Sequence, residues 1–168
     1  MPTSPKAPVE RAVPPAAMIR VGNRLLSSLL SSPRTAARVG QALLLLHVTG
    51  RRTGRVYSTP VSYHREADGR LLVVTSSRWR VNLRGGPTPV EVTLLGTRMP
   101  AVATLEEDPE VVAGFYERVI GKLGHEKAAR RLGIRITVPR APTHEELVEA
   151  AQREHLSLLH LDVGAGRP

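Results

Sequence analysis

Two short segments of this sequence combine residue types that bind anions and pack against flat rings. The first, starting at residue 50, reads Gly-Arg-Arg-Thr-Gly-Arg. Glycines four positions apart let the chain turn tightly and bring its N–H groups near a ligand, and arginine forks make bidentate contacts with phosphate or carboxylate. This segment predicts an anion-binding turn. The alternative is a solvated hairpin whose arginines bind no ligand. A Walker phosphate loop is excluded because no Gly-Lys-Ser/Thr sequence opens a helix here.

The second segment, starting at residue 75, reads Thr-Ser-Ser-Arg-Trp-Arg-Val-Asn-Leu. A helical turn after the serines would place Trp79, Asn82 and Leu83 on one face, because they are spaced at i, i+3 and i+4. Arg80 and Arg84 would then share another face. The tryptophan alone fits a core anchor equally well, and the serines could cap the helix or contact a ligand.

The hydrophobic pattern supplies the elements that must position these segments. Apolar residues at helical spacing over residues 17–30 predict an amphipathic helix that packs on the core or lies on a membrane surface. Asp108 before Pro109, and Thr143 three residues before Glu146, are typical helix starts. We expect strands over residues 42–48, 55–65, 71–75, 90–95, 98–104 and 156–163, and later helices over residues 108–120, 125–132 and 143–154.

The second of these strands alternates between two faces. Tyr57, Thr59, Val61 and Tyr63 share one face. Pro60 lies between them and cannot donate a hydrogen bond to a neighbouring strand, so we expect an edge, a bulge or a ligand at its position. About six mostly antiparallel strands with peripheral helices predict an α+β fold whose sheet closes into a small split β-barrel.

Length and composition predict one globular domain. The chain has 168 residues, 41% of them hydrophobic, and no cysteine, which favours a single domain over residues 16–165 in the cytoplasm. Residues 1–15 contain five prolines and predict a flexible tail. The net charge of +9 permits binding to nucleic acid, anionic lipid or a polyanionic small molecule.

Other function classes find little support in the sequence. The best basic cluster for nucleic acid has no interleaved aromatic residues for base stacking; it comprises Arg130, Arg131, Arg135 and Arg140. His144 and His155 share a helix face without a third ligand, so we expect no metal site.

The two segments together, at this spacing, resemble the deazaflavin (coenzyme F420)-dependent nitroreductase and oxidoreductase family of FMN-binding split-barrel-like proteins. The matching stretches are "LLLLHVTGRRTGRVYSTPVSY", "LLVVTSSRWRVNLRGG" and "GTRMPAVATLEEDPE". The resemblance covers about residues 16–121, with a weaker match through the final strand. It departs from the family at Ser77, where members carry a basic residue, and in the shortened loop before Trp79.

The resemblance implies a set of cofactor-binding residues. The arginine turn would hold the anionic tail of coenzyme F420, the following strand would line its ring, and the serine–tryptophan segment would lie beside it. The residues so implied are Arg51, Arg52, Thr53, Gly54, Tyr57, Thr59, Pro60, Val61, Ser76, Ser77, Trp79 and Asn82. Tyr63 is a weak candidate for a proton donor.

The implied function is that of an oxidoreductase in which reduced coenzyme F420 transfers hydride to a small apolar acceptor, such as a quinone or a nitroaromatic compound. Two alternatives stay open, an FMN-dependent split-barrel oxidoreductase and a noncatalytic carrier of a lipophilic ligand. Relatives that reach lipophilic quinones at the inner face of the membrane suggest a peripheral contact through residues 17–30.

Overall fold

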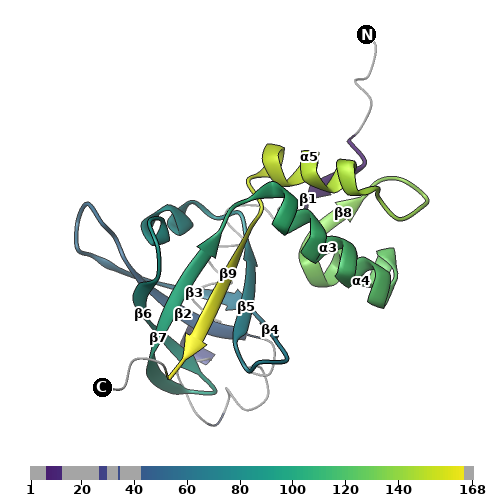
Figure 1. Cartoon of the computed structure of the whole chain (residues 1–168). Coiled ribbons are helices and arrows are strands. Elements are labelled where there is room, and N and C mark those ends of the chain that lie inside the picture. Colours follow the sequence, from purple (N-terminus) through teal and green to yellow (C-terminus); the bar gives the residue numbers. More distant parts are fainter. Residues whose placement is uncertain (1–6, 13–26, 30–33, 35–42, 165–168) are drawn as a thin grey trace. The chain divides into compact units, whose positions relative to one another are not determined.

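The computed structural model describes residues 7–12, 27–29, 34 and 43–164, which belong to two compact units (Figure 1). A barrel unit comprises Pro14–Leu105 and Leu158–Pro168. A helical unit comprises Met1–Val13 and Glu106–Ser157. Both motif segments of the sequence lie in the barrel unit.

The barrel unit contains one sheet of seven strands, in the order β3-β2-β6-β7-β9-β5-β4. The pairings β2–β3, β2–β6, β4–β5 and β6–β7 are antiparallel, which confirms the expected α+β class. Every strand expected from the sequence is present. The strands are β2 (Leu43–Thr49), β3 (Val56–Ser62), β4 (His64–Arg65), β5 (Leu71–Thr75), β6 (Thr88–Leu94), β7 (Thr97–Glu106) and β9 (Ser157–Val163).

The sheet curls because its two edges are parts of one stretch of chain. The expected strand over residues 55–65 is interrupted at Tyr63: β3 pairs with β2 at one edge, and β4 pairs with β5 at the other. Pro60 lies in β3, opposite Leu45, and β3 has a single neighbour in the sheet. The edge position explains why the strand tolerates a proline.

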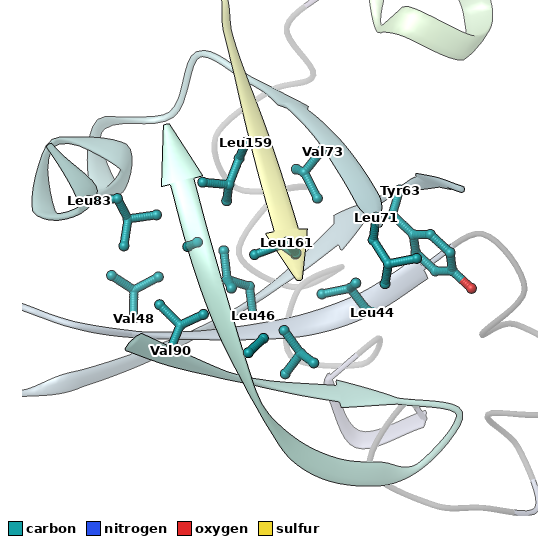
Figure 2. Packing of buried hydrophobic residues seen from close by; sticks show 13 residues of the cluster. Leu44, Leu46, Val48, Tyr63, Leu71, Val73, Leu83, Val90, Leu159 and Leu161 are labelled. Atoms are coloured by element: carbon teal, nitrogen blue, oxygen red, sulfur yellow. The ribbon is translucent and has the colours of Figure 1, made fainter. Parts of the chain in front are cut away.

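Alternate residues of the strands fill the barrel core. Leu44, Leu46 and Val48 from β2 point toward Leu159 and Leu161 from β9 (Figure 2). Each of these five side chains is at most 1% exposed. Burial of this kind contributes about 1.5–3 kcal/mol for each large aliphatic side chain, so the barrel is stabilised mainly by this layer.

The helical unit is built from three helices and a two-stranded sheet. Asp108 accepts a hydrogen bond from the Glu110 N–H at 2.9 Å and begins the first helix, as its position before Pro109 predicts. The elements are β1 (Val9–Arg11), α3 (Pro109–Leu123), α4 (His125–Leu132), β8 (Ile134–Ile136) and α5 (His144–Glu154).

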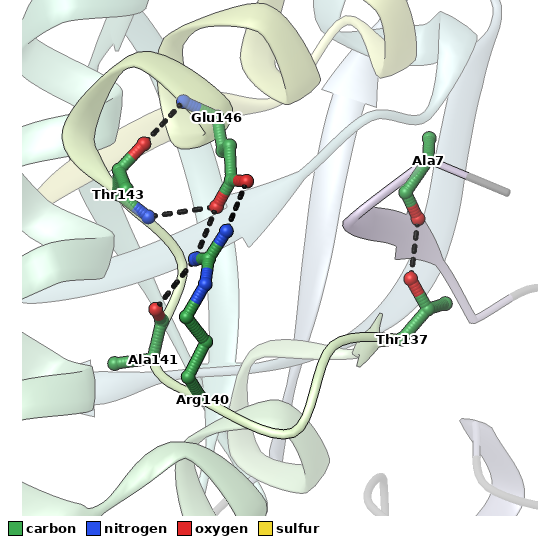
Figure 3. Close-up of polar contacts among 6 residues, drawn as sticks. All are labelled: Ala7, Thr137, Arg140, Ala141, Thr143 and Glu146. Carbon is green, nitrogen blue, oxygen red and sulfur yellow. Dashed lines mark hydrogen bonds and ion pairs between the residues drawn. The ribbon is translucent and has the colours of Figure 1, made fainter. Parts of the chain in front are cut away.

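Strand β1 differs from the expected flexible tail. Val9 is 1% exposed and pairs with Ile136 of β8. The Thr137 hydroxyl donates to the Ala7 carbonyl at 2.6 Å (Figure 3). Proline content predicts disorder, but the three residues of β1 contain no proline and pair with β8.

The predicted capping box of α5 is confirmed (Figure 3). Thr143 accepts from the Glu146 N–H at 3.3 Å, and the Glu146 carboxylate accepts from the Thr143 N–H at 2.9 Å. Arg140 also binds this carboxylate through two contacts, at 2.8 and 2.7 Å. Hydrogen bonds from Arg140 are the main reason that the pKa of Glu146 falls to about 2. Arg140, a member of the basic cluster considered in the sequence, is thus ion-paired with Glu146.

The expected amphipathic helix over residues 17–30 lies mostly outside the described residues. Residues 27–29 are helical, and Leu29 is exposed. Among the helices of the described part, none has the length and apolar character needed to cross a membrane.

Candidate functional site

The arginine segment forms the connection between β2 and β3. The Gly54 N–H donates to the Gly50 carbonyl at 2.8 Å, and the Gly50 N–H donates to the Arg55 carbonyl at 2.8 Å. Gly54 has φ of +66°, a left-handed conformation that glycine adopts without steric cost. The Thr53 hydroxyl accepts from the Arg55 N–H at 3.3 Å. Three hydrogen bonds therefore fix the turn, which is tight, as the glycine spacing predicts.

The second segment forms a 3₁₀ helix, η1 (Arg78–Leu83), and the structure brings it against the turn. The main-chain N–H of Arg51 donates to Asn82 Oδ1 at 3.1 Å. Asn82 Nδ2 donates to the Trp79 carbonyl at 3.0 Å. The Arg51 guanidinium donates through Nη2 to the Arg84 carbonyl. Two motifs about thirty residues apart in the sequence thus form one hydrogen-bonded unit.

The turn carries positive charge without compensating carboxylates. In the described part of the chain, Arg51, Arg52 and Arg55 have no acidic partner, and the Arg52 guanidinium contacts no hydrogen-bonding group at all. Arg55 lies over the Tyr57 ring, with its guanidinium carbon 5.9 Å from the ring centroid. These exposed cations can receive an anionic ligand through charge-assisted hydrogen bonds.

Strand β3 places its candidate residues on two different faces. Tyr57, Thr59 and Val61 lie opposite Val48, Leu46 and Leu44, which are core residues. Pro60 lies opposite Leu45 and faces the other side of the sheet. Since neighbouring strand residues point to opposite faces, Thr59, Pro60 and Val61 cannot all line one side of a planar ring. Of the candidate residues in this strand, Tyr57 is the one whose ring lies beside the turn, next to Gly50.

The serines lie at the end of β5, half-buried, next to η1. Ser77 occupies the position before η1, but its side chain makes no cap hydrogen bond. The Ser77 N–H donates to the Thr75 hydroxyl at 3.1 Å. The helix-capping alternative is therefore wrong for Ser77, and its hydroxyl stays available to a ligand.

The residues of η1 differ in part from the expected arrangement. Trp79 packs against the barrel core, and Leu83 is 1% exposed, as the expected face requires. Arg80, expected on a separate face with Arg84, is buried at 6% exposure. Its Nη1 atom donates to the Ser77 carbonyl at 3.2 Å and the Ser76 carbonyl at 3.4 Å. The 3₁₀ geometry, with about three residues per turn, moves Arg80 away from the position an α-helix would give it.

Tyr63 lies in the core rather than at the turn. Its ring packs near Leu44 and Leu71 (Figure 2), and the residue is 8% exposed. We therefore give it no part in the proposed function. Among the described residues, no group of three or more histidine, aspartate or glutamate side chains could hold a metal ion.

His47 is a buried polar residue of the barrel that the sequence analysis did not single out. It is 8% exposed, on the face of β2 opposite to the core residues Leu46 and Val48. Its ring nitrogens contact the hydroxyls of Ser58 at 2.7 Å and Thr93 at 2.8 Å. One signal was present in the sequence, a lone histidine inside the apolar run Leu-Leu-Leu-Leu-His-Val.

Comparison with known proteins decides the family. Residues 31–139 match the family model described as F420H(2)-dependent quinone reductase. The chain belongs to this family. It is therefore an oxidoreductase whose cofactor is coenzyme F420, and the matched region includes both the arginine turn and η1.

The other comparisons add less to this family assignment. A solved structure entitled a domain-swapped dimer aligns with a TM-score of 0.39 and 14% sequence identity, covering 89% of this chain and 100% of its own. The search of curated proteins finds no match.

Proposed function

We propose that this protein uses reduced coenzyme F420 to reduce a small apolar acceptor of the quinone class, and that the coenzyme binds at the β2–β3 turn and η1. One observation carries the proposal. The Arg52 guanidinium is exposed and without a partner in the described part of the chain, on a turn that hydrogen bonds hold against η1.

The residues present fit an anionic cofactor. Arginine forks match phosphate and carboxylate oxygens, and neither Arg51 nor Arg52 has an acidic neighbour to compete with such a ligand in the described part. Thr53 and Gly54 complete the turn, so that its main chain lies close to whatever Arg52 binds.

The flat ring of the coenzyme would lie beyond the anionic group, toward residues that can pack against it or donate hydrogen bonds. We assign to this part of the site the exposed ring of Tyr57, the hydroxyls of Ser76 and Ser77, and Trp79, whose main-chain carbonyl accepts a hydrogen bond from Asn82. When bound, the coenzyme supplies the hydride, so the side chains need only position it and the acceptor and exclude water.

The acceptor follows from the family and from the character of these residues. Quinone reduction is the activity for which the family is named. Val56, Tyr57 and Val81 are 50%, 45% and 42% exposed, which gives the turn and η1 apolar groups for an acceptor ring to contact. A nitroaromatic compound has a similar flat, electron-poor ring, and it is the acceptor class to compare with a quinone.

Titration of the full chain with coenzyme F420 and, separately, with FMN tests cofactor binding. We expect tight binding of F420, and Arg52→Ala should weaken it about ten- to hundredfold, because a charge-assisted hydrogen bond contributes about 1.5–3 kcal/mol. Arg65→Ala is the matched control, since Arg65 is an exposed arginine of the same unit in β4. Tight FMN binding without a response to F420 would refute the proposal.

Steady-state oxidation of reduced F420 then tests the acceptor. A naphthoquinone and a nitroaromatic compound of similar size are offered at equal concentrations. We expect a higher kcat/KM for the quinone, and preference for the nitroaromatic compound would contradict the proposed acceptor class while leaving the cofactor site intact.

A further inference from the structure

We propose that Arg51 is a positioning residue that holds η1 against the β2–β3 turn, and that Arg52 supplies the guanidinium that binds the anionic group of the coenzyme. The inference rests on the proposed function for its second half only. The family resemblance gives both arginines the same role, contact with the anionic tail of the coenzyme. We assign that contact to Arg52 and a positioning role to Arg51.

Two contacts of Arg51, one with Asn82 and one with the carbonyl of Arg84, hold η1 against the turn, and together we call them the latch. The main chain of Arg51 provides the first contact. Its N–H donates to Asn82 Oδ1 at 3.1 Å, and the Nδ2 atom of the same amide donates to the Trp79 carbonyl at 3.0 Å. Both ends of the Asn82 amide are thus used, which fixes the orientation of the side chain. The turn is joined to the first residues of η1 through one side chain.

The Arg51 side chain provides the second contact, at the other end of η1. Nη2 donates to the carbonyl of Arg84, the residue that directly follows η1. The next residue, Gly85, has φ of +99°, and a Cβ atom built there would stand 3.4 Å from Arg51 Nη2. The positive φ favours glycine at this position, and a Cβ atom there would make only an ordinary contact with the guanidinium. With both Arg51 contacts in place, η1 is held at both ends.

Arg52 follows in the same turn and has none of these contacts. Its side chain is exposed and has no hydrogen-bond or ionic partner among the described residues. A guanidinium that already donates to a carbonyl is fixed in orientation, whereas an unpartnered one can adapt its fork to phosphate or carboxylate oxygens. The geometry therefore assigns the ligand contact to Arg52.

Hydrogen exchange in the cofactor-free full chain tests the latch. Arg51→Met removes the guanidinium, and Asn82→Leu removes the acceptor of the Arg51 N–H without changing the charge. We expect amides of residues 78–85 to exchange about tenfold faster in both variants, because each loses a hydrogen bond to the turn. Arg52→Met should exchange as the wild type does. Unchanged exchange in both Arg51→Met and Asn82→Leu would overturn the latch.

Binding of coenzyme F420 at several salt concentrations tests the division of roles. A direct ionic contact is screened by salt. We therefore expect Arg52→Met to lose at least tenfold in affinity and to become less sensitive to salt. Asn82→Leu should lose affinity by a smaller factor and keep the salt dependence of the wild type.

Two other outcomes separate this inference from the proposed function. An Arg51→Met variant that loses as much affinity and salt dependence as Arg52→Met, with exchange in residues 78–85 as in the wild type, would show that Arg51 is itself a ligand contact and overturn the inference. Faster exchange in Arg51→Met and Asn82→Leu, with F420 affinity equal in all variants, would support the latch and refute the proposed cofactor site.

Discussion

The Nε2 atom of His47 lies 2.8 Å from the Thr93 hydroxyl, in the neighbouring strand of the barrel sheet. The other ring nitrogen contacts Ser58 on the opposite side, so one buried imidazole joins β3, β2 and β6. A charged imidazole at this position would be poorly solvated. Protonation of His47 is therefore coupled to the stability of the barrel sheet.

Acid should destabilise the barrel unit through His47. Burial is the main cause that lowers its pKa below the ordinary value of 6.5; Arg98 acts in the same direction, and Glu91 opposes them. Because the unfolded chain binds a proton more readily, the stabilisation is present above pH 6.5 and is lost as the pH falls through 6.5 toward the lower folded pKa.

An NMR titration of the His47 ring should give a pKa below 6.5. A midpoint above that value would contradict the prediction. His47→Gln should lose this part of the pH dependence in urea unfolding.

His144 should act in the opposite direction in the helical unit. Its ring nitrogens lie 2.9 Å from Glu110 and 3.1 Å from Glu117, so it joins α5 to α3. The hydrogen bonds that its ring donates to the carboxylates of Glu110, first, and Glu117 raise the pKa of His144. The folded state holds the proton more firmly, so this stabilisation is present below pH 6.5 and is lost as the pH rises through the folded pKa. His144→Gln should lower the unfolding temperature at pH 5.5 and leave it unchanged at pH 9, and an equal effect at both values would show that charge plays no part.

Tyr116→Phe should stabilise the helical unit. The residue is 1% exposed, and its hydroxyl is the buried side-chain group without a hydrogen-bond partner in the described part of the chain. An unsatisfied buried hydroxyl costs about 1–3 kcal/mol, so its removal should raise the free energy of unfolding by about 1 kcal/mol. Urea unfolding measures the change, with the exposed Tyr57→Phe as the neutral control. A loss of stability in Tyr116→Phe would show that the hydroxyl has a partner.

Gly50→Ala should disturb the coenzyme site more than the fold. A Cβ atom at Gly50 would lie 2.9 Å from Tyr57 Cε2 and 3.2 Å from Thr53 Oγ1, so the Tyr57 ring has to move. The ring is 45% exposed and can move at little cost. We expect an F420 affinity at least several-fold lower with a nearly unchanged unfolding temperature. Gly54→Ala should instead lower the unfolding temperature. Its φ of +66° strains any side chain by about 1–2 kcal/mol, although no atom lies within 4 Å of the added Cβ atom.

The fold could be predicted from local signals wherever these were strong. Alternation and turn residues located the barrel strands except for the break that separates β4 from β3, and the two helix caps at Asp108 and Thr143 are present as expected. Local signals were weaker where pairing partners are distant in the sequence. Strand β1 is an example, because the buried residue Val9 pairs with Ile136, more than 120 positions away.

The candidate site was predictable in its parts but not in its assembly. The types and spacing of residues in the arginine turn and around Trp79 are local properties, and they were sufficient to indicate an anion-binding family. The sequence could not show that Asn82 receives the Arg51 N–H, or that Arg80 turns inward, because both depend on the 3₁₀ form of η1.

The sequence by itself therefore determined the α+β class, which follows from hydrophobic periodicity. It indicated the family and the cofactor through a resemblance carried by motifs that are local in the chain, and the family-model match shows both. Only the tertiary structure distinguishes Arg51 from Arg52 and so supports the proposed division of roles between them. The two residues are chemically identical and adjacent, so only the contacts made when the chain folds distinguish them. Arg51 contacts Asn82 and Arg84, whereas the Arg52 side chain contacts no hydrogen-bonding group among the described residues.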